Sequence, residues 1–200
     1  MAVDSTSPMQ SRPLVKIAIT PFDIFDDEHL FIIEILNAGW DYVHLRHPAA
    51  TTTDMRRLIE NIPQCFHGQL KLHGHFELLN EFNLGGIHLN SRCPQPPKLY
   101  NGSISKTCHN INEITTCSYC DYVTLSPIFD SVSKVGYLGA FTKEELNDLP
   151  NNIRVIALGG VTPTHLEDVK LYGFAGYAVL GYLFQAQDIT ELKQRLKNFK

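Results

Sequence analysis

The sequence predicts a compact (βα)8 barrel of the TIM type, a closed ring of eight parallel strands. Eight strand-like segments recur along the chain, each followed by a helical pattern or its remnant. Regular alternation of strand and helix indicates a parallel sheet, because parallel neighbours need crossover connections. The 200 residues divided by eight leave 25 per unit, near the lower size limit for such a barrel. No G-x-G-x-x-G motif follows the first strand, which disfavours an open dinucleotide-binding sheet.

The strand-like segments are short apolar and β-branched runs. Residues 14–20 (LVKIAIT) alternate apolar and polar side chains, and Pro21 ends the pattern. The same pattern returns in residues 41–46 (DYVHLR) after the first helix-like stretch. The eight expected strands are residues 14–20, 41–46, 69–73, 85–90, 103–107, 121–126, 152–160 and 176–181.

Helix signals lie between these strands. Asp26 and Asp27 precede an apolar series that ends at Gly39, which is typical of an acidic helix start and a glycine stop. Pro163 fits a first helical turn, and Gly173 fits a helix end. The later helices are expected at residues 51–62, 76–82, 110–117, 141–149, 163–173 and 188–199, with the helix after the fourth strand reduced to a proline-rich loop.

Composition excludes several functional classes. The 17 basic and 21 acidic residues give a net charge of -4, so no basic field favours nucleic acid as a partner. No apolar run approaches the roughly 20 residues that span a bilayer, and residues 1–13 are polar, unlike a signal peptide. We therefore expect a cytoplasmic protein with a flexible tail at 1–13, one barrel domain at 14–200 and no membrane partner. Five cysteines are too few for a disulfide scaffold and are expected to be free thiols.

Polar residues collect where the expected strands end. In a barrel of this kind the ligand site lies at the carboxyl ends of the strands. Six of the nine histidines fall there, and strand periodicity places His44 and Arg46 on one face. A single such histidine is more often a hydrogen-bonded core or loop residue, so the clustering is the stronger observation. The strand-end histidines are His44, His47, His73, His75, His88 and His109.

Glycines end the last two strands. Gly159 and Gly160 follow the seventh strand, and Gly181 follows the eighth. Glycine lets backbone N–H groups approach an anion closely, and these two loops commonly bind phosphate in this architecture. Glycines can equally serve only to make tight turns. A phosphate-bearing ligand is therefore one of two interpretations of this end of the barrel.

Other candidates are weaker. Ser131, Ser133 and Lys134 would offer hydroxyl donors and a cation to a second anion, although such loops are often only solvated. The pair Cys117 and Cys120 matches C-x-x-C without a second pair, so we interpret it as structural. Other strand-end residues offer ligand atoms for a soft metal, but their spacing does not show convergence, so we predict no metal site. The residues considered for it are His73, His75, Cys93 and His109.

Five segments together resemble a known family. They are HLR (44–46), GGIHLN (85–90), DYVTLSPIFDSVSK (121–134), VIALGGVTP (155–163) and GYAVLGYLF (176–184). In order and spacing they resemble the thiamine phosphate synthase / TenI family, from the second strand to the last helix. The likeness is greatest to the branch named thiamine phosphate pyrophosphorylase in Bacteroides-type bacteria. Membership implies the barrel independently of the periodicity.

The resemblance also implies an activity. The synthase joins hydroxymethylpyrimidine diphosphate to hydroxyethylthiazole phosphate and releases pyrophosphate, so its site must stabilise leaving-group charge. By the family pattern Arg46, together with Ser131, Ser133 and Lys134, would contact the pyrophosphate. Backbone amides of the strand-end glycines would hold the thiazole phosphate, and Thr107 with His109 matches the family's Ser-x-His element. The expected catalytic residues are Arg46, His73, His109 and Lys134, and the expected substrate-binding residues are His44, His47, His88, Thr107, Ser131, Ser133, Gly159, Gly160 and Gly181.

The sequence departs from the family at its metal ligands. Mg²⁺ is the cofactor that the family implies, held by two aspartates. Here His73-Gly74 stands where the family carries Asn-Asp, and Cys93 stands where it carries the second aspartate. Mg²⁺ prefers carboxylate oxygen to imidazole or thiol. His44 and Pro48 also replace the glutamine and lysine that flank the family arginine, and His47 would partly replace the lost cation.

Three hypotheses follow. A synthase with an altered diphosphate site predicts metal-dependent product. A TenI-like thiazole tautomerase, or another proton-transfer enzyme on a thiazole phosphate, predicts metal-independent turnover set by an imidazole. The histidine of that branch is replaced by Pro127, so His109, His73 or His88 would have to serve as the base. A non-catalytic binder of a thiamine-pathway phosphate predicts binding alone, and the sequence leaves open whether the protein is a homo-oligomer.

Overall fold

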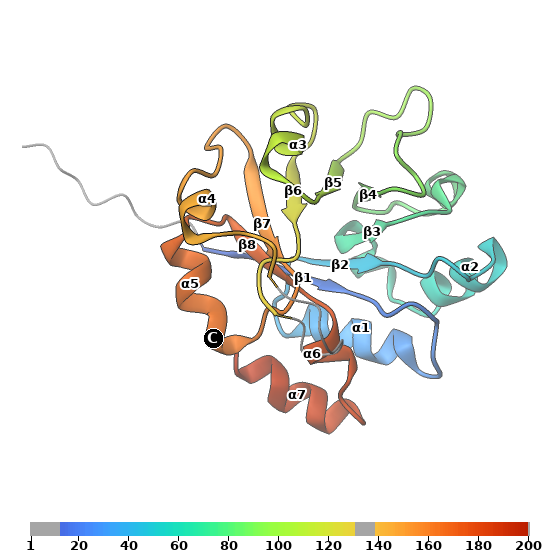
Figure 1. The fold of residues 1–200 in the computed structure, drawn as a ribbon. Helices are drawn as coiled ribbons and strands as arrows, with labels where there is room; N and C mark the ends of the chain where they lie inside the picture. The colour runs from blue at the N-terminus through green and yellow to red at the C-terminus, as the bar shows by residue number, and fades with distance from the viewer. Residues whose placement is uncertain (1–12, 131–138, 200) are drawn as a thin grey trace, which may run out of the picture.

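Eight parallel strands form a closed barrel in which each strand pairs with its neighbours in chain order, β1 to β8, and β8 pairs with β1 (Figure 1). The computed structural model describes residues 13–130 and 139–199, so the predicted tail lies outside it except for Pro13. The predicted (βα)8 barrel is confirmed. The strands are β1 Val15–Ile19, β2 Tyr42–Leu45, β3 Leu70–Leu72, β4 Gly86–Leu89, β5 Ile104–Cys108, β6 Tyr122–Leu125, β7 Arg154–Leu158 and β8 Gly176–Val179.

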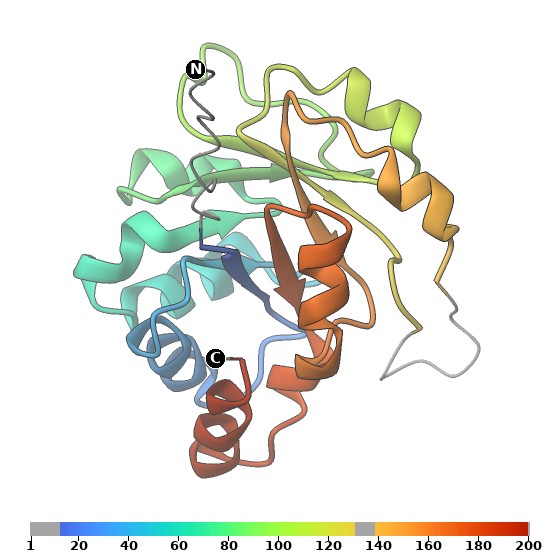
Figure 2. The same ribbon diagram turned by 90° about the vertical axis from the view of Figure 1, so that its left-hand side faces the viewer.

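Helices lie outside the ring, as both ribbon views show (Figures 1 and 2). Helices α1 and α7 lie side by side, and Lys193 Nζ of α7 is 3.4 Å from Glu34 Oε2 of α1. The first and last helices therefore meet beside the strands that close the barrel. The α-helices are α1 Glu28–Asn37, α2 Thr52–Glu60, α3 Ile111–Thr115, α4 Lys143–Asn147, α5 Leu166–Leu171, α6 Gly181–Phe184 and α7 Ile189–Lys197.

Short 3₁₀ segments supplement these helices. The expected helix at 76–82 is the 3₁₀ helix η2, Phe76–Asn80, and η3, Pro163–His165, leads into α5. Another segment, η1 (Gln64–Gln69), and the four-residue α6 were not predicted, because so short a run shows no helical periodicity. The loop between β4 and β5 contains no helix, in agreement with the prediction.

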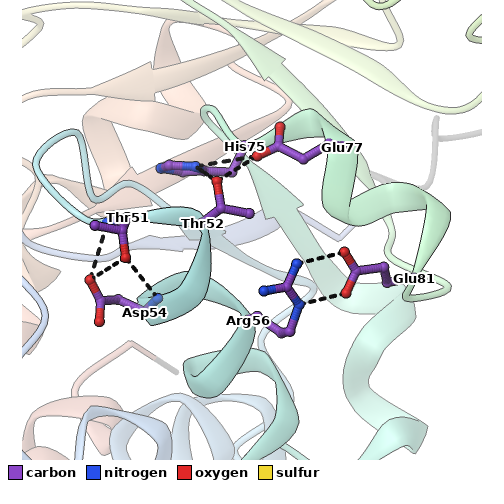
Figure 3. Close-up of polar contacts among 7 residues, drawn as sticks. All are labelled: Thr51, Thr52, Asp54, Arg56, His75, Glu77 and Glu81. Atoms are coloured by element: carbon purple, nitrogen blue, oxygen red, sulfur yellow. Dashed lines mark hydrogen bonds and ion pairs between the residues drawn. The ribbon is translucent and has the colours of Figure 1, made fainter.

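The cap of α2 shows how sequence fixes a helix start. Thr51 Oγ1 accepts a hydrogen bond from the Asp54 N–H at 3.2 Å, and the Asp54 carboxylate accepts one from the Thr51 N–H (Figure 3). This reciprocal capping box satisfies two N–H groups that a helix start otherwise leaves unpaired. The Thr-rich start predicted at residue 51 is therefore the observed one.

Two apolar regions fill the fold. The larger lies between strands and helices and includes Trp40, whose ring packs edge-on against Phe199 and Tyr177. The smaller lies among β1, β6, β7 and β8 and contains Ile17, Ile19, Tyr122, Ile156 and Ala178. Buried polar side chains from β2 to β6 accompany it: His44, Lys71, His88, Ser105 and Thr124. No helix of the described residues is both long and apolar enough to cross a membrane.

Candidate functional site

A cavity of about 580 Å³ lies where the strands end in loops. This volume is in the range of small-molecule sites. Its wall is formed by residues at the ends of β1 to β8, so segments far apart in sequence meet there. The predicted site residues that line it are Arg46, His73, Thr107, His109, Gly159, Gly160 and Gly181.

One end of the cavity is made of backbone. Gly159 and Gly160 have φ angles of +93° and +66°, which L side chains rarely adopt. Among the described residues, the N–H groups of these glycines and of Gly181 donate to no protein acceptor. They are therefore available to an anion in the way that phosphate loops are. We call this region, Gly159, Gly160 and Gly181, the glycine end.

The glycines at this end also have a packing role. The loop after β6 crosses them, with Ile128 N–H donating to Leu158 O at 2.9 Å and Phe129 N–H to Gly159 O at 3.0 Å. A Cβ on Gly159 would lie 2.8 Å from Pro127 Cα, closer than real Cβ atoms approach. These glycines therefore allow the close packing of the loop after β6 and also leave backbone N–H groups available to a phosphate, so the two interpretations are compatible.

The opposite wall carries two arginines, Arg46 after β2 and Arg92 in the loop after β4, which we call the arginine end. Arg46 is half-buried, and its backbone N–H donates to Thr20 Oγ1 at 2.7 Å. Burial lowers the pKa of the Arg46 guanidinium, and the charge of Arg92 lowers it further. Neither arginine forms an ion pair with a carboxylate of the described residues. Two cations without a protein counter-ion favour an anionic ligand.

Three imidazoles lie together under this wall. Tyr122 Oη is 2.7 Å from His44 Nε2, and His44 Nδ1 is 2.9 Å from His73 Nε2. The ring of His88 stacks on that of His73 with 4.2 Å between centroids. Of the three, only His73 lines the cavity, at the end of β3, whereas His44 and His88 lie wholly inside the barrel.

These imidazoles are neutral at pH 7. Burial lowers the pKa of each, to about 3 for His88, and the nearby Lys71 ammonium lowers the pKa of His44 and His88 further. Lys71 Nζ lies 5.0 Å and 4.8 Å from the ring centroids of Tyr42 and Tyr122, and burial lowers its pKa to about 8. The partners of His88, Ser105 Oγ at 2.9 Å and Thr107 Oγ1 at 2.7 Å, satisfy both of its nitrogens.

His109 lines the cavity after the end of β5. Its Nδ1 is 3.1 Å from the carbonyl oxygen of Ser126, which can only accept, so Nδ1 carries the proton and donates. Of the two neutral tautomers, this bond selects the one whose Nε2 accepts. The backbone N–H of His109 donates to Glu113 Oε2 at 2.9 Å, which holds the start of α3 against the end of β5.

The model of one family, TMP-TENI, described as thiamine monophosphate synthase, matches residues 17–183. The chain belongs to this family. The resemblance stated from the sequence is thereby confirmed, and the glycine end and Arg46 fall within the matched residues.

Individual proteins named as thiamine phosphate synthases or pyrophosphorylases are also similar to this chain. A solved thiamine phosphate pyrophosphorylase from Bacteroides thetaiotaomicron is 32% identical with a TM-score of 0.82, covering 93% of this chain and 95% of that one. The thiamine-phosphate synthase of Latilactobacillus sakei is 27% identical over 163 residues, 74% of this chain and 70% of the relative. That of Limosilactobacillus reuteri is 24% identical over 134 residues, and the match spans only 62% of its length.

The residues present do not fit the Mg²⁺ that the thiamine monophosphate synthase family implies. A Cβ on Gly74 would lie 3.9 Å from Cys93 Sγ, so the two positions that carry aspartates in the family pattern face each other here without a carboxylate. The only carboxylate among the described residues that line the cavity, that of Glu113, already accepts from the His109 N–H. Among the described residues, this wall therefore offers a hard cation no pair of carboxylates.

A softer metal meets a different obstacle. His44, His73 and His88 form the only cluster of potential ligands among the described residues, with ligand atoms within 4.8 Å of one another. Imidazole suits zinc or copper, but Lys71, Arg46 and Arg92 surround the cluster closely enough to lower the pKa values of its members. A divalent cation would be repelled by the same three charges.

Several predicted residues lie elsewhere. His47 is buried behind β2 with its Nε2 2.9 Å from Glu28 Oε1 of α1, and it does not line the cavity. His75, which was considered as a metal ligand, contacts Thr52 Oγ1 at 3.1 Å beside α2 and η2 (Figure 3). Ser131, Ser133 and Lys134 lie outside the described residues.

Sequence reasoning missed Arg92. Its position three residues after the end of β4 was the available signal, because cavity residues follow strand ends. The neighbouring Cys93 is weighed from the sequence as a soft-metal ligand and as a replaced aspartate, and the arginine beside it is not singled out.

Proposed function

We propose that the protein joins hydroxymethylpyrimidine diphosphate to hydroxyethylthiazole phosphate, forming thiamine phosphate and releasing pyrophosphate. The observation that supports this proposal is one cavity whose backbone N–H groups at the glycine end and guanidinium groups at the arginine end have no partner among the described residues. Two anion-binding ends suit two phosphorylated substrates that react between them. Membership of the thiamine monophosphate synthase family supports the choice of substrates.

The reaction requires the site to stabilise the negative charge that develops on the leaving pyrophosphate. The bond between the pyrimidine methylene carbon and the pyrophosphate oxygen breaks, and the leaving pyrophosphate takes the electron pair. The thiazole nitrogen lone pair then forms the new carbon–nitrogen bond at that methylene. In this proposal Arg46 stabilises the charge that develops on the leaving group, and the glycine end holds the thiazole phosphate in line with the methylene. Thr107 and His109 line the cavity between these groups as substrate contacts.

Ser131, Ser133 and Lys134 belong to the same proposal. In this proposal they contact the pyrophosphate, where two hydroxyl donors and an ammonium would supplement Arg46. His73, the imidazole at the cavity wall, would offer the neutral ring to the pyrimidine as a hydrogen-bond partner. His44 and His88 would act through it, since each contacts the His73 ring inside the barrel.

The test is product formation by the purified protein. Both substrates are supplied, once with Mg²⁺ or Mn²⁺ and once with a chelator, and thiamine phosphate and pyrophosphate are measured by mass spectrometry. Equal amounts of the two products in either arm support the proposal. Absence of product in every arm, beside turnover by the Latilactobacillus sakei thiamine-phosphate synthase in the same buffer, would contradict it.

A second candidate is proton transfer on a thiazole phosphate. The observation that favours it is the position of His109 at the cavity wall, where its Nδ1 donates to the Ser126 carbonyl oxygen and Nε2 is its other ring nitrogen. Among the described residues, no pair of carboxylates at this wall fits Mg²⁺. Such an enzyme would move a proton from one ring carbon to another without a metal. Solvent deuterium appearing in a thiazole carboxylate phosphate, with loss of the exchange in His109→Gln, would support this reaction instead.

A further inference from the structure

The arginine end differs from the family pattern by a loss and a gain at adjacent positions. Gly74 and Cys93 replace the two aspartates, and they face each other across 3.9 Å when a Cβ is placed on Gly74. Arg92 precedes Cys93 directly and lines the same cavity as Arg46. The positively charged Arg92 is therefore adjacent in sequence to one of the two positions that hold the metal in the family pattern.

Charge explains why these changes belong together. Two aspartates with one Mg²⁺ have a formal sum of zero, whereas neutral Gly74 and Cys93 with Arg92 have a formal sum of +1. Removing the carboxylates alone would remove the metal and its charge. Adding a guanidinium restores a positive group that can face a pyrophosphate, with a donor fork that matches phosphate oxygens.

We propose that Arg92 binds the pyrophosphate group together with Arg46, so that two guanidinium groups take the place of the divalent cation and the anion site works without metal. This inference rests on the proposed function, which supplies the pyrophosphate. It adds Arg92 to the substrate-binding residues and changes the chemical class of the site from metal-assisted to guanidinium-assisted. No covalent step differs from the reaction given above.

The loop that carries Arg92 is held in place. Asn90 Oδ1 accepts hydrogen bonds from the N–H groups of Arg92 at 3.0 Å and Cys93 at 3.3 Å. The amide nitrogen of the same side chain donates to the carbonyl oxygen of His73 at 2.8 Å. Asn90 thereby ties the loop after β4 to the end of β3, next to His73 at the cavity wall. A positioned loop loses less conformational freedom when Arg92 meets its anion.

The surroundings of Arg46 agree with an anion held between two cations. Its guanidinium is half-buried, and its pKa is lowered first by burial and then by the charge of Arg92. The two guanidinium groups repel each other across the cavity. Neither has a carboxylate partner among the described residues that would offset this repulsion. An anion between them relieves that repulsion and gains two charge-assisted contacts.

The test is calorimetric binding of inorganic pyrophosphate in the presence of excess chelator. We expect the unmodified protein to bind, and Arg92→Ala and Arg46→Ala each to weaken binding at least about tenfold, the loss of one charge-assisted contact. Arg92→Lys keeps the positive charge but loses the paired N–H donors of the guanidinium, so its pyrophosphate affinity should lie between those of the unmodified protein and Arg92→Ala. Arg56→Ala is the matched control, because Arg56 pairs with Glu81 outside the cavity at 2.6 Å and should leave binding unchanged (Figure 3).

The inference would be overturned by pyrophosphate binding that appears only with Mg²⁺, or by equal pyrophosphate affinity in Arg92→Ala and the unmodified protein. Binding that appears only with Zn²⁺ and disappears in His73→Ala would also overturn it, in favour of the histidine cluster. Thermal unfolding of each variant shows that it is folded before binding is measured. Pyrophosphate binding does not require turnover, so its loss is distinguishable from failure to form thiamine phosphate.

Discussion

The half of the barrel made by β6, β7, β8 and β1 has an interior that is apolar except for Thr124, and its strands end at backbone amides that have no partner among the described residues. The half made by β2 to β5 has a polar interior, and its strand ends carry guanidinium groups. The first half depends on backbone geometry, which Gly159 and Gly160 fix through positive φ angles. The second depends on which side chains are present, and a substitution such as aspartate to Cys93 changes its chemistry at once. Within one cavity, the resemblance stated from the sequence predicts that the glycine end keeps the family pattern and that the arginine end departs from it.

The largest expected effect tests the glycine end. In Gly160→Ala the new Cβ would overlap the carbonyl oxygens of Phe129 and Asp130, at a φ of +66°. We expect a loss of about 3 kcal/mol in unfolding free energy, measured with urea, and loss of thiazole phosphate binding. Gly173→Ala is the control, since Gly173 has a φ of +73° with nothing within 4 Å of its Cβ.

That control should lose only about 1 kcal/mol, the effect of the backbone angle alone, and should keep its thiazole phosphate affinity. Equal destabilisation by the two variants would mean that the loop after β6 does not pack on Gly160. Full thiazole phosphate affinity in a folded Gly160→Ala protein would remove the glycine end from the binding site.

The next effect tests the arginine end. Arg46→Ala should lower kcat/KM for thiamine phosphate formation about 100-fold, because the leaving pyrophosphate loses a charge-assisted donor in the transition state. Arg56 pairs with Glu81, and Arg56→Ala should therefore keep the kcat/KM of the unmodified protein. Unchanged kcat/KM in Arg46→Ala would show that the leaving group lies elsewhere in the cavity.

The smallest effect concerns the polar interior. The folded protein holds the pKa of His88 at about 3, below the ordinary 6.5, so the unfolded chain binds this proton first as the pH falls. The contribution of this pKa difference to the free energy of unfolding is fully present above pH 6.5 and is lost as the pH falls towards 3. Between pH 7.5 and 5.5, His88 should account for about 1 kcal/mol of lost unfolding free energy.

Urea unfolding of His88→Asn at both pH values measures that share. The variant should lose about 1 kcal/mol less than the unmodified protein over this interval, whatever its stability at pH 7.5. His29→Asn, on α1 outside the barrel interior, is the control and should lose as much as the unmodified protein. Identical losses in all three proteins would show that His88 is protonated in the folded state as readily as in the unfolded chain.

Much of the fold could be predicted from the sequence, because the evidence for it is periodic. Alternating segments and the glycine and proline stops place all eight strands and most helices. Only segments too short to show a period, such as η1 and α6, were missed. The glycine end was predictable for a related reason, since Gly159 and Gly160 restrict the backbone by their own chemistry.

The arginine end was predictable only in part. Strand periodicity shows that His44 shares a face with Arg46, but it does not show depth, and His44 lies inside the barrel while Arg46 reaches the cavity. His47 lies beyond the strand end, where periodicity no longer applies, and it packs against Glu28. Arg92 lies in a loop, and only the fold brings it to the wall that Arg46 lines.

The most direct test of the account is the Mg²⁺ dependence of the initial rate of thiamine phosphate formation, started in excess chelator and followed to millimolar free Mg²⁺. Because Arg46 and Arg92 supply the positive charge, the account predicts a rate in chelator within about twofold of the rate with metal. A rate that is absent in chelator and rises to saturation with Mg²⁺ would contradict it, since the chain would then bind the metal without the two aspartates.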